Sequence, residues 1–93
     1  MSSRRWQVVI ASPAARDIDR LPMKIAAAAL EAIHSIAADP RRIGKPLELE
    51  LKGQWSARRG PYRIIYSIDD STAPITVTAV AHRADVYRRG RRG

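Results

Sequence analysis

The hydrophobic pattern of this chain changes its period between the first and the second half. Between residues 13 and 38, apolar side chains recur every three to four residues, which is the spacing of one face of a helix. From residue 55 to residue 80 they recur every second residue, as in a half-buried strand. Helices followed by strands are typical of an α+β domain with a mainly antiparallel sheet. The chain has 93 residues, so we expect one domain over residues 1–93.

The first half of the chain predicts one strand and two helices. In residues 6–11, Trp6, Val8 and Ile10 fall on one face, as in a half-buried strand. Ser12 followed by Pro13 is typical of a helix start, and Pro22 interrupts the helical spacing. Helices are therefore predicted at 13–21 and 23–38. Because only a proline separates them, they should form a hairpin that packs on the sheet.

The second half predicts three strands and a short helix. The strands are residues 55–59, 62–68 and 75–80, which make a four-stranded sheet with the N-terminal strand. Residues 39–54 should be mostly loop. Leucines alternate with charged residues at 47–52, which allows either a short edge strand or an extended segment there. A short C-terminal helix is predicted at 83–89, and residues 90–93 should fray.

The charge of the chain is strongly positive. Lys and Arg number 17 against 9 Asp and Glu, which gives a net charge of +8, and most of the excess lies after residue 50. Most of these cations are Arg, whose guanidinium matches the geometry of phosphate. This bias favours a nucleic acid, an anionic membrane or an acidic protein as partner. Without cysteine or an apolar run of membrane-spanning length, we expect a cytoplasmic protein that does not bind a membrane.

Most catalytic and metal-binding patterns are absent from the sequence. His34 and His82 lie far apart and no cysteine is present, so a zinc site has little support. There is no phosphate loop and no dinucleotide fingerprint. Glu48 and Glu50 share a face of an extended segment, but a solvated edge explains them better than an acid–base pair. We expect neither a metal ion nor another cofactor.

Three arginines and one tyrosine form the most informative set. Arg58, Arg63 and Arg83 come from three successive predicted elements, and Tyr87 follows one helical turn after Arg83. Guanidinium groups stabilise charge that develops on a reacting phosphate, and tyrosine stacks on bases or assists proton transfer. The residues alone leave two interpretations open. One is a phosphate site, and the other is a wet sheet face with Tyr87 as a core anchor.

Residues 51–69 (LKGQWSARRGPYRIIYSID) resemble the central motif of the RelE/ParE toxin superfamily, L-x-G-x-x-S-x-R-x-G-x-Y-R-[ILV]-[ILV]-Y-x-I. The segment 80–88 (VAHRADVYR) is similar to the C-terminal end of RelE-type members. The motifs A-x-R-D-[IL]-x-x-L-P at 14–22 and G-K-P-L at 44–47 match as well. The resemblance covers residues 6–89. From these four motifs, the chain is identified as a member of the RelE-like branch of the superfamily.

The resemblance implies a fold like that of small microbial ribonucleases and the role of toxin in a type II toxin–antitoxin pair. RelE-like toxins cut mRNA on the ribosome without a metal, by attack of the ribose 2′-hydroxyl on the adjacent phosphate. The implied partners are therefore the ribosome, mRNA and a cognate antitoxin with an acidic segment, in a heterodimer or a 2:2 complex.

The resemblance also implies roles for individual residues. Arg63 corresponds to the strand arginine that stabilises the phosphate transition state. Arg83 corresponds to the arginine that protonates or neutralises the leaving oxygen, and Tyr87 to the tyrosine that stacks on the nucleotide and accepts a proton. Arg58 corresponds to a further basic position on the substrate face. We expect Arg58, Arg63 and Arg83 to converge on the concave face of the sheet.

The sequence departs from the family pattern at one place. Gln54 and Ser56 stand where the best-known members have two lysines, which removes a candidate general base and two phosphate contacts. Arg58, Arg59 and Lys52 are the cations expected to compensate as substrate-binding residues. Some relatives use a C-terminal histidine as the acid, which makes His82 an additional candidate.

Two other functions remain open at this point. A ParE-like protein with the same fold would inhibit DNA gyrase without nuclease chemistry, and a basic RNA-binding module would have no activity at all. ParE-type members usually lack the complete set of Arg63, Arg83 and Tyr87, so its presence favours the nuclease.

Overall fold

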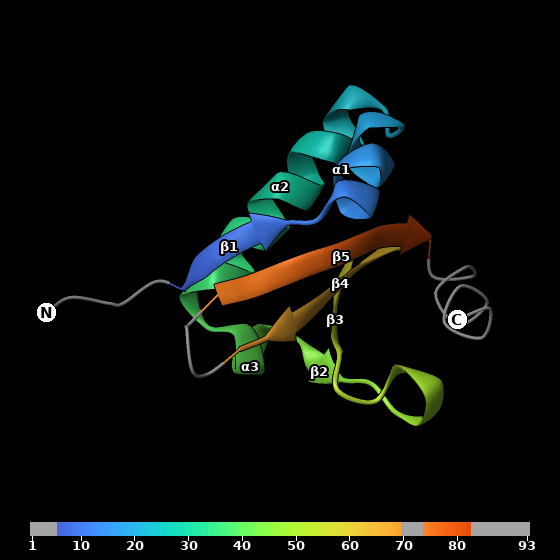
Figure 1. Cartoon of the computed structure of the whole chain (residues 1–93). Helices are drawn as coiled ribbons and strands as arrows, with labels where there is room; N and C mark the ends of the chain where they lie inside the picture. Colours follow the sequence, from blue (N-terminus) through green and yellow to red (C-terminus); the bar gives the residue numbers. More distant parts are fainter. Residues whose placement is uncertain (1–5, 70–73, 83–93) are drawn as a thin grey trace, which may run out of the picture.

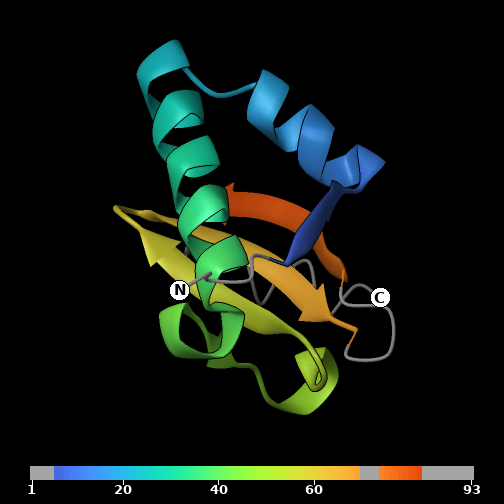
Figure 2. The same ribbon diagram turned by 90° about the vertical axis from the view of Figure 1, so that its left-hand side faces the viewer.

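The computed structural model describes residues 6–69 and 74–82, and these form one five-stranded sheet with two long helices on one face (Figures 1 and 2). In chain order the elements are β1 (Gln7–Ile10), α1 (Ser12–Asp19), α2 (Met23–Ala38), α3 (Pro40–Ile43), β2 (Lys45–Pro46), a 3₁₀ turn η1 (Leu49–Leu51), β3 (Trp55–Arg59), β4 (Tyr62–Ile68) and β5 (Pro74–His82). The α+β class, the N-terminal strand and the helical hairpin are confirmed.

The strands lie in the order β1-β5-β4-β3-β2. β1 pairs in parallel with β5 at one edge, and the other three pairs are antiparallel. The sheet has five strands where four were predicted, because β2 adds two residues to the edge of β3. That strand is short since Pro46 has no N–H with which to extend a ladder.

The two long helices differ slightly from their predicted bounds. α1 runs from Ser12 to Asp19 and not over 13–21, so Ser12 is the first helical residue and Ala11 is the N-cap. The helix ends early because Pro22 disfavours helical geometry at Leu21, the residue before it. α2 begins at Met23 and ends at Ala38, as predicted.

The segment between α2 and β3 is more ordered than its sequence suggested. Pro40 begins the one-turn helix α3, and the strand that follows is Lys45–Pro46. The edge strand considered at 47–52 is wrong, because Leu49–Leu51 form the 3₁₀ turn and Leu49 has a positive φ of 58°. The predicted helix at 83–89 and the frayed end at 90–93 lie outside the described residues.

A hydrogen bond from a core tyrosine fixes this segment to the sheet. Tyr66 is fully buried on β4 and its hydroxyl donates to the carbonyl oxygen of Pro40 at 2.5 Å. Gly44 lies so close that a Cβ on it would stand 2.0 Å from the Tyr66 hydroxyl. Only glycine fits there. The glycine of the G-K-P-L motif therefore lets the chain just before β2 pack closely against Tyr66 of β4.

The face of the sheet that packs on the helices, here called the helix face, carries the main core. Its ten buried residues come from both long helices and three strands: Ala14, Ala29, Ile33, Ile36, Ala57, Ile64, Tyr66, Ile75, Val77 and Val80. α1 is also held to β5 by a polar contact, because the Val80 N–H donates to Asp17 Oδ2 at 2.9 Å. No helix in the described ranges is long and apolar enough to cross a membrane.

The opposite face, here called the site face, has a smaller apolar cluster. Leu47, Ile65 and Ala81 are buried there, with Leu51 and Ala79 packed beside them. The alternation predicted for β4 is confirmed, since Ile64 and Tyr66 join the core on the helix face while Ile65 joins the cluster on the site face. Arg63 is two residues from Ile65 and therefore shares the site face.

Candidate functional site

Two arginines stand directly opposite each other on the site face. Arg58 on β3 pairs in register with Arg63 on β4, and directly opposite residues have Cβ atoms about 5 Å apart. Like charges at this spacing repel each other. Within residues 6–69 and 74–82, no carboxylate forms an ion pair with either guanidinium. The pair therefore presents concentrated positive charge to an anion.

A cavity of about 520 Å³ opens beside this pair. β3 and β4 contribute Ser56, Arg58 and Arg63 to it, and the segment from α3 to the end of β2 contributes further residues beside β3. Its lining residues are Ile43, Lys45, Pro46, Leu47, Ser56, Arg58 and Arg63. Among the described residues, the lining contains three cations and no carboxylate, so this part of the cavity suits an anionic group.

Two residues of this cavity were not given a role in phosphate binding by the sequence analysis. Lys45 pairs in register with Ser56, which places it on the same face as Arg58, two residues further along β3. Ser56 is only 6% exposed, and its Oγ has no hydrogen-bond partner among the described residues. The G-K-P-L motif was the available signal for Lys45, but only the β2–β3 register shows where it lies.

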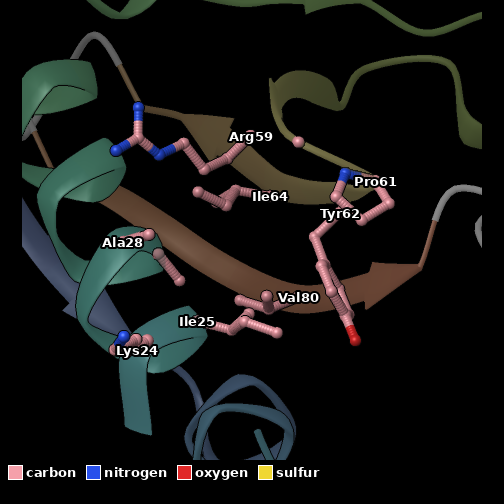
Figure 3. Close-up of a pocket in the computed structure, with 10 residues that line it drawn as sticks. Lys24, Ile25, Ala28, Arg59, Pro61, Tyr62, Ile64 and Val80 are labelled. Carbon is pink, nitrogen blue, oxygen red and sulfur yellow. The ribbon is translucent and has the colours of Figure 1, made fainter. Parts of the chain in front are cut away.

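Arg59 lies on the other side of the sheet from Arg58 and Arg63. It pairs in register with Tyr62 on the helix face, and its Nη2 lies 3.3 Å from Glu31 Oε1 on α2. Figure 3 shows its side chain directed toward α2, beside an apolar cavity of about 200 Å³ that Ile64 and Val80 also line. The structure therefore does not bring Arg59 to the predicted substrate face.

The remaining predicted cations are also separated from the arginine pair. His82 ends β5 with its ring edge-on to Tyr62, at 5.7 Å between ring centroids and 79° between planes, so it lies with the helix-face residues. Lys52 follows η1 in an exposed position and lines neither cavity. Gln54 accepts a hydrogen bond from Thr78 Oγ1 at 3.2 Å, which is a structural contact.

Arg83 and Tyr87 lie outside the described residues. Of the predicted convergence of three arginines, the structure shows the Arg58–Arg63 part. No group of three metal-ligating side chains lies together within the described ranges.

The cavity wall is held in place by a tyrosine whose ionisation is suppressed. Burial raises the pKa of Tyr66 to about 12, although a hydrogen bond from the Gly44 backbone acts in the opposite direction. The Tyr66 hydroxyl is therefore neutral at neutral pH and stays a hydrogen-bond donor to Pro40. Because Pro40 begins α3 and Gly44 follows its last residue, this contact fixes the segment that carries Ile43 and Lys45, which line the cavity.

Comparison with known proteins identifies the family. Residues 8–87 match the ParE toxin family of type II toxin–antitoxin systems. The chain is 46% identical to toxin RelG of Mycobacterium tuberculosis over 90% of this chain and 98% of that protein. It is 45% identical to toxin RelE of the same organism over 89% of this chain and 87% of that protein.

A solved structure supports the same assignment. The toxin–antitoxin complex RelBE2 from Mycobacterium tuberculosis contains a chain with a TM-score of 0.80 and 41% identity to this one. The alignment covers 85% of this chain and 99% of that chain. Family match, relatives and fold agree, so this chain belongs to the RelE/ParE superfamily, in its RelE-like branch, among the toxins of type II toxin–antitoxin systems.

Proposed function

We propose that this toxin is a ribosome-dependent, metal-independent endoribonuclease that cleaves mRNA and acts in the cytoplasm. The observation that carries the proposal is the Arg58–Arg63 pair. Among the described residues, the pair has no ion-pair partner, and the cavity that it faces has no carboxylate. Such a pair suits the phosphodiester of an RNA strand, because guanidinium groups bind phosphate oxygens through charged, geometrically matched hydrogen bonds.

In the proposed reaction, the ribose 2′-oxygen attacks the adjacent phosphorus and the bond to the 5′-oxygen breaks, which leaves a cyclic phosphate. Negative charge grows on the non-bridging oxygens in the transition state, and Arg63 neutralises it there. Arg58 holds the same phosphate in position. The 2′-hydroxyl loses a proton and the departing 5′-oxygen gains one. Family resemblance assigns these tasks to Tyr87 and Arg83.

We also propose a cognate antitoxin as the protein partner. A solved structure with 41% identity to this chain is itself a toxin–antitoxin complex. Arg58, Arg63 and Lys45 have no ion-pair partner within residues 6–69 and 74–82, so a free toxin attracts an acidic segment to this cavity. Binding of such a segment would block access of RNA. A heterodimer or a 2:2 complex is expected, with binding that weakens as salt rises.

Inhibition of DNA gyrase is the second candidate, because the matching family is that of the ParE toxin. Two assays with the purified full-length chain separate the candidates: protein synthesis with mRNA mapping in a cell extract, and supercoiling by purified gyrase. The nuclease proposal expects new mRNA ends in the extract and unchanged supercoiling. Loss of supercoiling with intact mRNA would favour gyrase and contradict the proposal.

A further inference from the structure

We propose that strand β1 is a self-association edge, at which two copies of this chain pair antiparallel and join their sheets about a two-fold axis at Val9. The proposal goes beyond the proposed function, which places RNA and antitoxin at the site face and gives no role to β1. In the described sheet, β1 lies at one edge beside β5, and β2 lies at the other (Figure 1).

The two edges differ in how they are protected against pairing with another chain. β2 consists of Lys45 and Pro46, and short edge strands with a lysine or a proline resist such pairing. β1 has the sequence QVVI, which contains neither a charge nor a proline, and its Val9 and Ile10 are 51% and 37% exposed. An uncharged, apolar edge strand is a template for another strand.

The backbone of β1 directs two residues toward the open edge. The Ala11 N–H donates to the carbonyl oxygen of Val77 on β5. Because backbone groups point alternately to the two sides of a strand, Val9 is also turned toward β5, while Val8 and Ile10 are turned outward. No backbone hydrogen bond joins these outward groups to another described residue.

Neighbouring elements limit the open edge to this short stretch. The N–H of Trp6, which is turned outward like that of Val8, already donates to the carbonyl oxygen of Ala37 in α2. At the other end, Ser12 is the first residue of α1 and leaves the sheet. The free backbone groups of the edge are therefore those of Val8 and Ile10.

This stretch is complementary to itself in one register. With Val9 opposite Val9 of the second copy, each Val8 faces an Ile10, and the two pairs form four N–H···O=C bonds. A register centred on Val8 would need the Trp6 N–H, which is already bonded, and one centred on Ile10 would need Ser12 in an extended strand. Only the register centred on Val9 uses every open group.

The charge and the size of the edge determine how the association behaves. β1 carries no cation that would attract an acidic segment, so a second copy fits it better. Four residues a side make a small interface, and we expect a dissociation constant on the order of 100 μM. Each copy has a net charge of +8, so the dimer should tighten as salt rises, whereas RNA binding should weaken.

The first test is sedimentation of the purified full-length chain from about 10 μM to about 1 mM, at low and at high salt. The wild type should dimerise, more tightly at high salt. Val9→Lys should stay monomeric, because it places two ammonium groups opposite each other on the axis. Met23→Lys is the matched control, since Met23 is 87% exposed at the start of α2, and it should dimerise like the wild type. A monomeric wild type at about 1 mM, or equal dimerisation of Val9→Lys, would overturn the proposal.

The second test measures the register, because the chain contains no cysteine. Opposite Cα atoms in a non-hydrogen-bonded pair are about 4.5 Å apart, which a disulfide can span. Val9→Cys should therefore cross-link two copies under mild oxidation at least about tenfold faster than Ile10→Cys, whose Cα atoms would be about 8 Å apart. Met23→Cys should also be slow although it is more exposed.

Non-reducing gels follow the cross-linking over time. Equal rates for the three cysteine variants, or a faster rate for Ile10→Cys, would show random collision or another register and would overturn the proposal. Both variants on β1 exchange one small side chain for another, so this comparison decides the question even if Val9→Lys does not fold. The result is independent of the proposed function, because neither test uses RNA or ribosomes.

Discussion

The two faces of the sheet are built from the same strands but differ in core packing and in charge. On the helix face, ten residues form the main core. Arg59 lies on the same face and forms an ion pair with Glu31. On the site face, three buried residues form a small cluster, and Arg58 and Arg63 stand opposite each other with no carboxylate partner in the described ranges. Stability is concentrated on one face and unbalanced charge on the other.

Strand β4 contains this contrast within a few residues. Ile64 and Tyr66 are fully buried against the helices, while Arg63 and Ile65 alternate with them on the site face. A rigid strand packed on one side can hold cations at fixed positions on its other side, and such preorganisation is what transition-state stabilisation requires. The comparison predicts that substitutions on the two faces have separable effects on stability and on activity.

The largest effect on stability is expected for a pair of substitutions in neighbouring residues of β4. Ile64→Ala should lower the free energy of unfolding by about 4 kcal/mol, because it opens a cavity in the main core. Ile65→Ala should cost only about 2 kcal/mol, since its cluster is smaller. Urea denaturation of the two variants measures the difference. Equal losses would mean that the site face contributes as much to stability as the helix face.

The next effect concerns the polar contact between α1 and β5. Asp17→Ala should lower the free energy of unfolding by about 2 kcal/mol, because the Val80 N–H loses a charged acceptor. Asp19→Ala, on the exposed side of the same helix, is the control and should change it by less than about 0.5 kcal/mol. The same denaturation assay applies. Equal losses of unfolding free energy in the two variants would show that the Asp17 hydrogen bond to Val80 does not stabilise the helix face.

Alkaline pH tests the tyrosine that holds the cavity wall. The pKa of Tyr66 is about 12 in the folded chain, against 10.0 for a free tyrosine. The unfolded chain therefore loses this proton first, and stability that is fully present below pH 10 is lost as the pH rises toward 12. The loss should be on the order of 1–2 kcal/mol. Tyr66→Phe lacks this titration, so its stability should fall less over the same range. Parallel pH profiles would contradict the assignment.

The smallest effect is expected for the ion pair on the helix face. Side chains of Arg59 and Glu31 are 51% and 77% exposed, so water screens their attraction. Arg59→Ala or Glu31→Ala should change the free energy of unfolding by at most about 0.5 kcal/mol. A double-mutant cycle measures the coupling between them. A coupling well above 1 kcal/mol would show that this pair is structural and not a surface contact.

The periodic parts of the sequence predicted the fold well. Helix α2 and strands β3 and β4 lie where their apolar spacing placed them, because a long amphipathic pattern allows only one face to be buried. The segment from α3 to η1 was not predicted. Its form depends on the Tyr66 contact with Pro40 and on the space available at Gly44, which are tertiary interactions.

The candidate site was predicted only in part for the same reason. Alternation placed Arg63 on its own face of β4, and the hairpin register then placed Arg58 opposite it. Arg59 was assigned to the substrate face, but it is adjacent to Arg58 on a strand and must point the other way. Lys45 was missed because its position depends on the pairing of a two-residue strand with Ser56.

We propose that the site face carries out catalysis, and two arginines on adjacent strands, one on each face, provide the most direct test. The measurement is single-turnover cleavage of mRNA on programmed ribosomes at saturating toxin, for Arg63→Ala and Arg59→Ala beside the wild type. We predict that Arg63→Ala lowers the rate about 100–1,000-fold while ribosome binding weakens only modestly, and that Arg59→Ala keeps the wild-type rate. Equal rates for the two variants would contradict the assignment of the chemistry to the site face.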